Sequence, residues 1–259
     1  MTMIRMLPAA LAAAFAFAAG PAQAEMKTQW VGYSQGDLKL YGYQVHEDSL
    51  SGKRPAILMV HDREGMTDHT KHMAENWSKL GYVVFAADIF GLGQGVAAKD
   101  ETESRAQTEI FRQDRPLLRA RTQAAFEMLT KNPMVEASRI ALIGYCFGGA
   151  TGLEFGSTGA PLAANVSIHG SFGGHDAGWA KNIKGRYLIL HGAEDVNYSL
   201  AKAVNPVLDE LRTAKVKFQL EVYSGTGHGF SRPKNPDEER ANAQSIASTG
   251  RTLKELFGI

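Results

Sequence analysis

Ile143–Gly144–Tyr145–Cys146–Phe147–Gly148–Gly149–Ala150 is the stretch that decides the fold of this chain. The residues just before it, 139–143, form a short apolar run that is typical of a buried strand. The residues after it are small and lead into helix-compatible sequence. A strand that turns sharply into a helix brings two backbones close together, and glycines on both sides of the turn allow that approach. The stretch therefore predicts a strand–turn–helix elbow with Cys146 at its corner, where serine is more usual.

Cys146 is the only cysteine in the chain. The predicted turn exposes its sulfur at the carboxyl edge of a sheet, beside the first N–H groups of the following helix. Those groups and the helix dipole favour a thiolate. A buried, inert thiol is the alternative interpretation, and the residues found further along the chain favour a catalytic one.

Strands and helices alternate on both sides of this elbow. We expect strands at 38–45, 56–61, 82–87, 139–143, 162–169, 186–191 and 216–223, and helices at 68–80, 116–131, from 206 and from 236. The N-cap is expected at Thr67 or Asp68 for the first of these helices and at Asn235 for the last. The first strand alternates in polarity and is expected to be antiparallel, whereas several later ones are continuously apolar, as in parallel strands covered on both faces. The pattern predicts an α/β fold with a doubly wound, mostly parallel sheet and helices on both faces. Ligands then bind at the carboxyl ends of the strands.

Length and composition fit one soluble globular domain. The chain has 259 residues, of which 44% are hydrophobic and 21% charged, and a net charge of +1. An α/β fold of this size is usually a single domain. The near-zero charge and the lack of a basic run argue against a nucleic-acid partner.

The first 24 residues resemble a cleavable signal peptide. Arg5 supplies a basic start, 7–19 is an apolar run too short to span a bilayer, and Ala22–Gln23–Ala24 has the small-x-small pattern of a cleavage site. We expect a cut after Ala24, a mature domain at 25–259 and a periplasmic or secreted protein without a membrane anchor. The alternative is an uncleaved anchor.

Residues 90–113 interrupt the alternation. Three glycines, at 91, 93 and 95, are followed by polar sequence from Lys99. Such a long connection is either a lid over the site or a surface excursion. The glycine spacing does not match a phosphate-binding loop, so the sequence indicates no nucleotide cofactor.

Two further groups complete a candidate triad with Cys146. Asp195 lies just after the strand expected at 186–191, and His228 lies among glycines after the strand at 216–223. The order nucleophile, acid, histidine is that of α/β hydrolases. Cys146 would attack a carbonyl, His228 would carry the proton, and Asp195 would orient the imidazole. Asp195 could instead cap a helix, and the adjacent Glu194 is the alternative acid.

These motifs resemble the dienelactone hydrolase family, over roughly residue 30 to the end. The resemblance is carried by G-Y-C-F-G-G at 144–149, H-G-A-E-D at 191–195, H-G-F at 228–230 and the segments 61–66 and 88–91. The family implies an oxyanion hole made by the backbone N–H groups of Phe147 and Arg63. It also implies a carboxylate that contacts the resting thiol. Asp62 matches that position, but the family residue is usually glutamate, and bracing of the loop is the alternative role for the shorter side chain.

The resemblance implies hydrolysis of a small ester or lactone. Family members that hydrolyse dienelactone need basic groups for its carboxylate, yet the loop after Asp88 has none before Lys99. Arg105, Arg112 and Arg115 could reach back from the insertion, so dienelactone itself is not predicted. Thioesterase or acyltransferase chemistry on the same triad, and a non-catalytic binding protein, are the alternatives.

The other histidines and the assembly give weaker signals. Three lie at strand ends, where they either line the pocket or are structural: His61, His169 and His191. His69 and His72 share a helical face without a further ligand, so no metal is predicted. The sequence leaves the oligomeric state open.

Overall fold

The computed structural model describes residues 25–259, and the signal peptide predicted at 1–24 lies outside them. The described residues form one eight-stranded sheet in the order β1-β2-β4-β3-β5-β6-β7-β8. All neighbouring strands from β4 to β8 are parallel, whereas β2 is antiparallel to both β1 and β4. The strands are β1 (Met26–Gln35), β2 (Leu38–Glu47), β3 (Arg54–Val60), β4 (Val83–Ala87), β5 (Val135–Tyr145), β6 (Ala164–Ile168), β7 (Arg186–Gly192) and β8 (Phe218–Tyr223). The predicted α/β fold with a mostly parallel sheet is confirmed.

Strand β1 was not predicted from the sequence. It pairs with β2 along its whole length, from Met26 opposite Glu47 to Gln35 opposite Leu38. As the edge strand it is half exposed, and Tyr33 is its one buried residue. Because so little of its surface is buried, its sequence lacks the apolar alternation by which strands are recognised.

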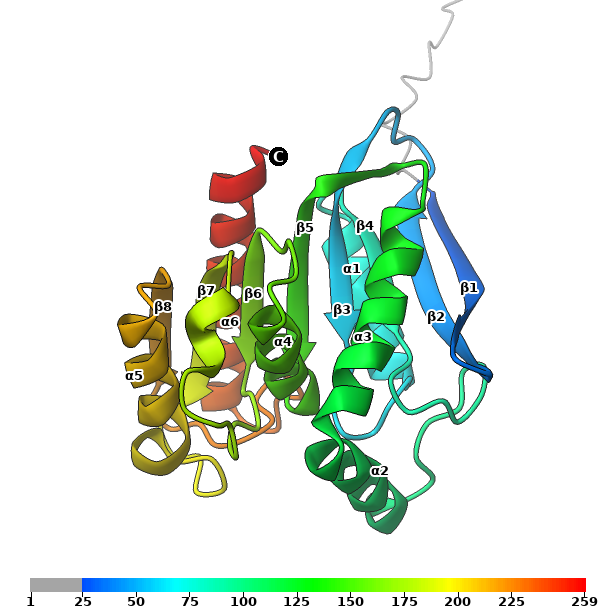
Figure 1. The fold of residues 1–259 in the computed structure, drawn as a ribbon. Helices are drawn as coiled ribbons and strands as arrows, with labels where there is room; N and C mark the ends of the chain where they lie inside the picture. The colour runs from blue at the N-terminus through cyan, green and yellow to red at the C-terminus, as the bar shows by residue number, and fades with distance from the viewer. Residues whose placement is uncertain (1–24) are drawn as a thin grey trace, which may run out of the picture.

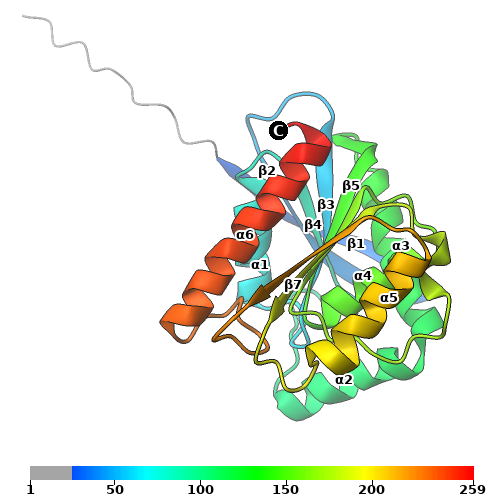
Figure 2. The same ribbon diagram turned by 90° about the vertical axis from the view of Figure 1, so that its left-hand side faces the viewer.

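The helices cover both faces of the sheet. Helices α1 (Asp68–Ser78) and α6 (Pro236–Phe257) lie on one face. Helices α3 (Arg115–Thr130), α4 (Phe147–Ser157) and α5 (Asn205–Thr213) lie on the other, as Figures 1 and 2 show. The caps of α1 and α6 follow the prediction: the side chains of Thr67 and Asn235 accept the N–H groups of Thr70 and Glu238.

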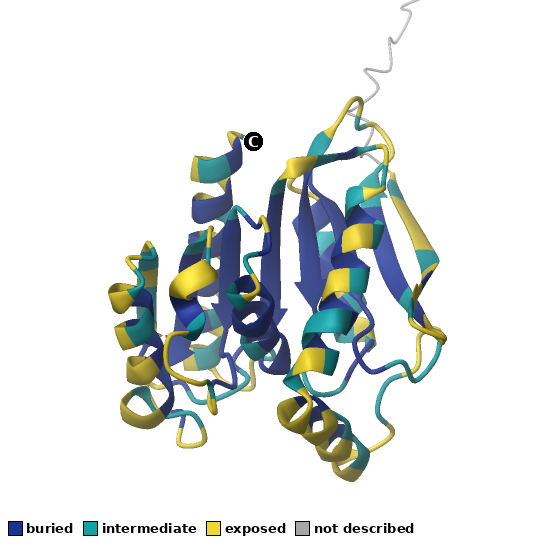
Figure 3. Ribbon diagram, in the orientation of Figure 1, coloured by how far each residue is buried: buried dark blue, intermediate teal, exposed yellow. Residues whose placement is uncertain are grey.

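The central strands form the core between these layers. Every residue of β4 and β6 is buried, and so is every residue of β3 after Arg54. Figure 3 shows this buried centre with exposed residues on the outer sides of the helices. Burial on both faces explains why these strands read as continuous apolar runs.

The insertion at 90–113 ends in a helix of its own. Helix α2 (Glu101–Gln113) begins after Asp100, whose side chain accepts the N–H of Glu103. Figure 1 shows α2 beyond the carboxyl ends of the strands, and Figure 3 shows that much of it is exposed. The inward side holds Ser104, Thr108 and Phe111. Two shorter helical turns, Trp179–Asn182 and Leu200–Val204, complete the described elements.

Candidate active site

The elbow between β5 and α4 places Cys146 at a sharp corner. Its backbone has φ 52° and ψ −109°, a conformation that non-glycine residues rarely adopt. A Cβ at Gly144 would lie 2.0 Å from the carbonyl oxygen of Gly148, and one at Gly148 would lie 2.3 Å from the carbonyl oxygen of Val60. Only glycine fits at these two positions, so the glycines permit the crossing that presents the sulfur.

The structure brings Cys146, His228 and Asp195 together. His228 Nε2 lies 3.0 Å from Cys146 Sγ, and His228 Nδ1 lies 2.7 Å from Asp195 Oδ2. The other carboxylate oxygen of Asp195 accepts the backbone N–H groups of Asn197 and Tyr198 at 3.0 and 2.9 Å. The three side chains follow β5, β7 and β8, whose carboxyl ends share one edge of the sheet.

Electrostatics favour a charged imidazole in this arrangement. Burial opposes the charge on His228, but the hydrogen bonds to Asp195 and Cys146 outweigh it and raise the pKa of His228 to about 9. Burial also works against the charge on Asp195, yet its bonds to His228 and the Tyr198 N–H lower the pKa of that carboxyl. The group is therefore suited to pass a proton between sulfur, imidazole and a bound substrate.

The backbone N–H groups of Phe147 and Arg63 are both free for a ligand. Within residues 25–259, neither donates to a protein acceptor. Both residues line the cavity that contains Cys146. Phe147 begins α4, so its N–H is one of the unpaired donors at a helix N-terminus. The arrangement can accommodate an anionic oxygen.

Asp62 does not bond to the thiol. Its Oδ2 accepts from Arg232 Nη2 at 2.7 Å, and its Oδ1 accepts the N–H of Glu64 at 2.8 Å. Within the described residues no hydrogen bond joins Asp62 to Cys146, so the predicted contact is replaced by the bracing role named as its alternative. The short side chain is held by Arg232, which also pairs with Glu64. The sequence analysis missed Arg232, whose one local signal is its place four residues after His228.

Two of the strand-end histidines have clear partners. His61 Nδ1 donates to the carbonyl of Asp62 at 2.6 Å, and its Nε2 accepts the N–H of Ile89 at 3.2 Å. This pattern fixes a neutral tautomer, and burial lowers the pKa of His61 accordingly. His169 Nε2 lies 2.7 Å from Ser231 Oγ, and its ring packs against that of His228. The bonds from His61 to Ile89 and from His169 to Ser231 each connect two segments at the edge where the triad candidates meet.

The thiol opens into a cavity of about 640 Å³. Helix α2 supplies one wall, with Arg105 and Arg112 among the lining residues. Tyr198 also lines this cavity, with its ring 5.1 Å from that of His228 and its hydroxyl accepting from Arg112. Tyr198 was not singled out from the sequence, although it follows Asp195 by three residues. Arg115, by contrast, pairs with Glu154.

No metal site or membrane span emerges from the described part of the chain. Residues 25–259 contain no cluster of three or more His, Cys, Asp or Glu side chains that could hold a metal ion. None of the helices among them combines the length and apolarity needed to cross a bilayer.

Comparison with known proteins assigns the chain to a family. The model of the dienelactone hydrolase family matches residues 40–257. The chain belongs to the dienelactone hydrolase family. It is accordingly an ester or lactone hydrolase of the dienelactone hydrolase type.

Individual relatives agree with this assignment. A putative carboxymethylenebutenolidase of Synechocystis is 24% identical over 261 residues, covering 90% of this chain and 97% of its own. A human carboxymethylenebutenolidase homolog is 24% identical and covers 77% of this chain and 80% of its own. The crystal structure of a dienelactone hydrolase-like promiscuous phosphotriesterase from metagenomic libraries is 33% identical, with a TM-score of 0.83, covering 91% of this chain and all of that one.

Proposed function

We propose that this protein hydrolyses small ester or lactone bonds with Cys146 as nucleophile and an acyl-thioester intermediate. The observation that carries the proposal is the continuous chain from Cys146 Sγ to His228 at 3.0 Å and from His228 to Asp195 at 2.7 Å. A thiol beside a base that is itself oriented by a carboxylate is the arrangement that nucleophilic catalysis requires.

The first half-reaction forms the acyl-enzyme. The sulfur of Cys146 attacks the carbonyl carbon while His228 holds the thiol proton. The tetrahedral oxyanion accepts hydrogen bonds from the N–H groups of Phe147 and Arg63, each contributing about 3 kcal/mol to lowering the barrier. Collapse breaks the carbon–oxygen bond, and His228 gives its proton to the leaving alkoxide. With a lactone, the alcohol remains part of the same molecule.

The second half-reaction returns the free enzyme. His228, now neutral, takes a proton from water, and the resulting hydroxide attacks the thioester carbonyl. The same two N–H groups bind the second oxyanion. The carbon–sulfur bond breaks, the acid leaves, and the sulfur recovers its proton from His228. Asp195 stabilises the imidazolium throughout.

Replacement of the sulfur tests this proposal. Cys146→Ala should lower turnover of a chromogenic acetate ester by roughly three orders of magnitude or more, because no other group replaces the nucleophile. Ser138→Ala, at the exposed start of the same strand, is the matched control and should retain full activity. Equal turnover by the wild type and Cys146→Ala would rule out the thiol mechanism.

A phosphotriester is the second candidate substrate, because a 33% identical solved structure is described as a promiscuous phosphotriesterase. Thioesters belong in the same panel because attack of Cys146 on a thioester releases a thiol and forms the same acyl-enzyme. Acyl acceptors other than water belong there because the acyl-enzyme can pass its acyl group to them. If a phosphotriester or thioester is turned over much faster than acetate esters and lactones, that compound class would replace esters and lactones as the proposed substrate. A fully folded protein inactive on every member of the panel would favour a binding protein.

We further propose that the protein is exported and cleaved after Ala24. The support is the basic start, short apolar run and Ala22–Gln23–Ala24 pattern of residues 1–24. A secreted or periplasmic protein whose amino terminus is Glu25 is the expected observation. A protein that keeps residues 1–24 after expression in its native host would contradict it.

A further inference from the structure

A second cavity opens beside the one that contains the thiol. It has a volume of about 430 Å³ and no lining contribution from Cys146 itself. The two cavities share the lining residues Glu109, Arg112, Phe147, Ser171 and Tyr198. A molecule whose reacting carbonyl lies at Cys146 can therefore extend past Phe147 into the second cavity without leaving the cleft.

Charged and apolar side chains both line the second cavity, and the charged ones are Glu109, Arg112, Arg115 and Glu154. The apolar ones come from four separate segments: Phe111 of α2, Leu118 of α3, Phe147 and Ala150 of α4, and Phe172 after β6. All of these except Ala150 are buried. Concave sites with aromatic and aliphatic walls bind apolar groups of small molecules, so the apolar part of this lining suits an aryl or alkyl group.

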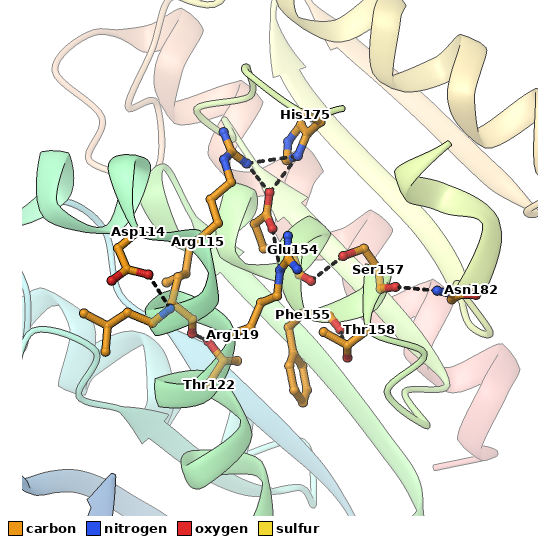
Figure 4. Close-up of polar contacts among 12 residues, drawn as sticks. Asp114, Arg115, Arg119, Thr122, Glu154, Phe155, Ser157, Thr158, His175 and Asn182 are labelled. Carbon is orange, nitrogen blue, oxygen red and sulfur yellow. Dashed lines mark hydrogen bonds and ion pairs between the residues drawn. The ribbon is translucent and has the colours of Figure 1, made fainter. Parts of the chain in front are cut away.

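The one buried carboxylate at this cavity is fully paired. Glu154 is 3% exposed, and its oxygens accept from Arg115, from Arg119 Nε at 3.0 Å and from His175 Nδ1 at 2.7 Å, as Figure 4 shows. Burial opposes its charge, but His175 and the two arginines lower the pKa of Glu154 to about 2. The carboxylate therefore has no free oxygen with which to repel or bind a ligand.

The same ion pairs fix the shape of the cavity. Arg115 also donates to the carbonyl of Gly173 at 2.6 Å, and Gly173 is itself part of the lining. The side chains of Arg115, Glu154 and His175 thus tie α3, α4 and the loop after β6 together (Figure 4). A cavity that is held in shape before binding loses little entropy when it is filled.

Ala150 lies on the wall that α4 contributes to this cavity. Phe147, Ala150 and Glu154 are spaced by three and four residues, which places them on one face of α4. All three line the second cavity, and Ala150 has the smallest side chain among its apolar walls. A larger side chain at 150 would occupy the cavity without replacing any triad residue.

We propose that the second cavity is a subsite for an apolar arm of the substrate, an aryl or medium-length alkyl group on the acyl or the alcohol side, and that Ala150 determines how large this arm can be. The inference rests on the proposed ester hydrolysis at Cys146. It narrows the substrate class to esters and lactones that carry such an arm.

The test compares wild type and Ala150→Leu on three esters, with acid release followed by a pH indicator. Methyl acetate has no arm, methyl phenylacetate has one on the acyl side, and benzyl acetate has one on the alcohol side. For one of the two arm-bearing esters, kcat/KM should fall by about tenfold or more through a raised KM, while that for methyl acetate stays within about twofold. The ester that is affected identifies the side of the substrate that enters the cavity.

Ala247→Leu, on an exposed position of α6, is the matched control and should behave as wild type. If Ala150→Leu does not fold, Ala150→Val makes the same comparison with a smaller added volume. Equal changes for all three esters, or none, would overturn the subsite. Failure of the wild type on every ester would instead reject the proposed hydrolysis, so the two outcomes remain distinct.

Discussion

The charge on His228 is set by its two neighbours on opposite sides of the ring. Asp195 Oδ2 lies 2.7 Å from Nδ1 and Cys146 Sγ lies 3.0 Å from Nε2. Together they raise the pKa of His228 to about 9 although burial acts in the opposite direction. An unfolded histidine titrates near pH 6.5, so the folded state binds the proton more tightly than the unfolded chain.

This difference makes stability depend on pH. Because the pKa is raised on folding, the stabilisation is complete below about pH 6.5 and is lost as the pH rises through about 9. Urea unfolding gives the free energy of unfolding of wild type and of His228→Asn. The difference between the two should therefore fall by on the order of 2 to 3 kcal/mol between pH 6 and pH 10. Asp195 stays ionised over this range because its pKa is lowered. A difference that does not change with pH would contradict the shift.

At the residue scale, the sequence predicted those site residues whose positions depend on their neighbours along the chain. Cys146, Asp195 and His228 each lie within five residues of the carboxyl end of a strand, so their meeting follows from the parallel sheet. The partner of Asp62 could not be predicted in this way, since Arg232 lies 170 residues further along the chain. A salt bridge between two loops leaves no periodic or spacing signal in either segment.

At the element scale, the elbow depends on the close crossing of α4 over the strand ends. A Cβ at Gly148 would lie 2.3 Å from the carbonyl oxygen of Val60 in β3, a contact with backbone that no side-chain rearrangement relieves. Gly148→Ala should therefore lower the free energy of unfolding by about 3 kcal/mol.

Gly250→Ala is the control for this prediction. Gly250 lies within α6, and nothing lies within 4 Å of a Cβ built there. That substitution should raise the free energy of unfolding by about 0.5 to 1 kcal/mol, since alanine favours a helix. Chemical denaturation measures the free energy of unfolding of both variants and of wild type. Similar changes in the free energy of unfolding for Gly148→Ala and Gly250→Ala would show that a Cβ fits between α4 and β3.

Elements differed in how well the sequence predicted them. The helix caps at Thr67 and Asn235 and the buried runs of β3 and β4 carry strong local signals, and they fold as predicted. Strand β1 carries none, because its place at the exposed edge requires little apolar surface. The role of α2 as a lid stays a prediction, although residues of this helix line the cavity with the thiol.

At the scale of the whole molecule, the sheet determines where chemistry occurs. Strands far apart in the sequence end at one edge, and the loops after β3, β5, β7 and β8 meet there. The mostly parallel, doubly wound sheet was predictable from the alternation of strands and helices, whereas the order of its strands was not predicted. The Glu154 cluster was not, because it joins α3, α4 and the loop after β6 through side chains whose charges look solvent-exposed in sequence.

The central claim is that turnover passes through the sulfur of Cys146, and stoichiometric alkylation tests it most directly. Since this is the only cysteine in the chain, the number of carboxamidomethyl groups on cysteine after iodoacetamide treatment, from mass spectrometry of the intact and digested protein, reports on one site. Ester turnover should fall in proportion to alkylation and reach zero at one group per chain, and a saturating ester should slow the reaction. A protein fully alkylated at Cys146 that still hydrolyses the ester would contradict the account.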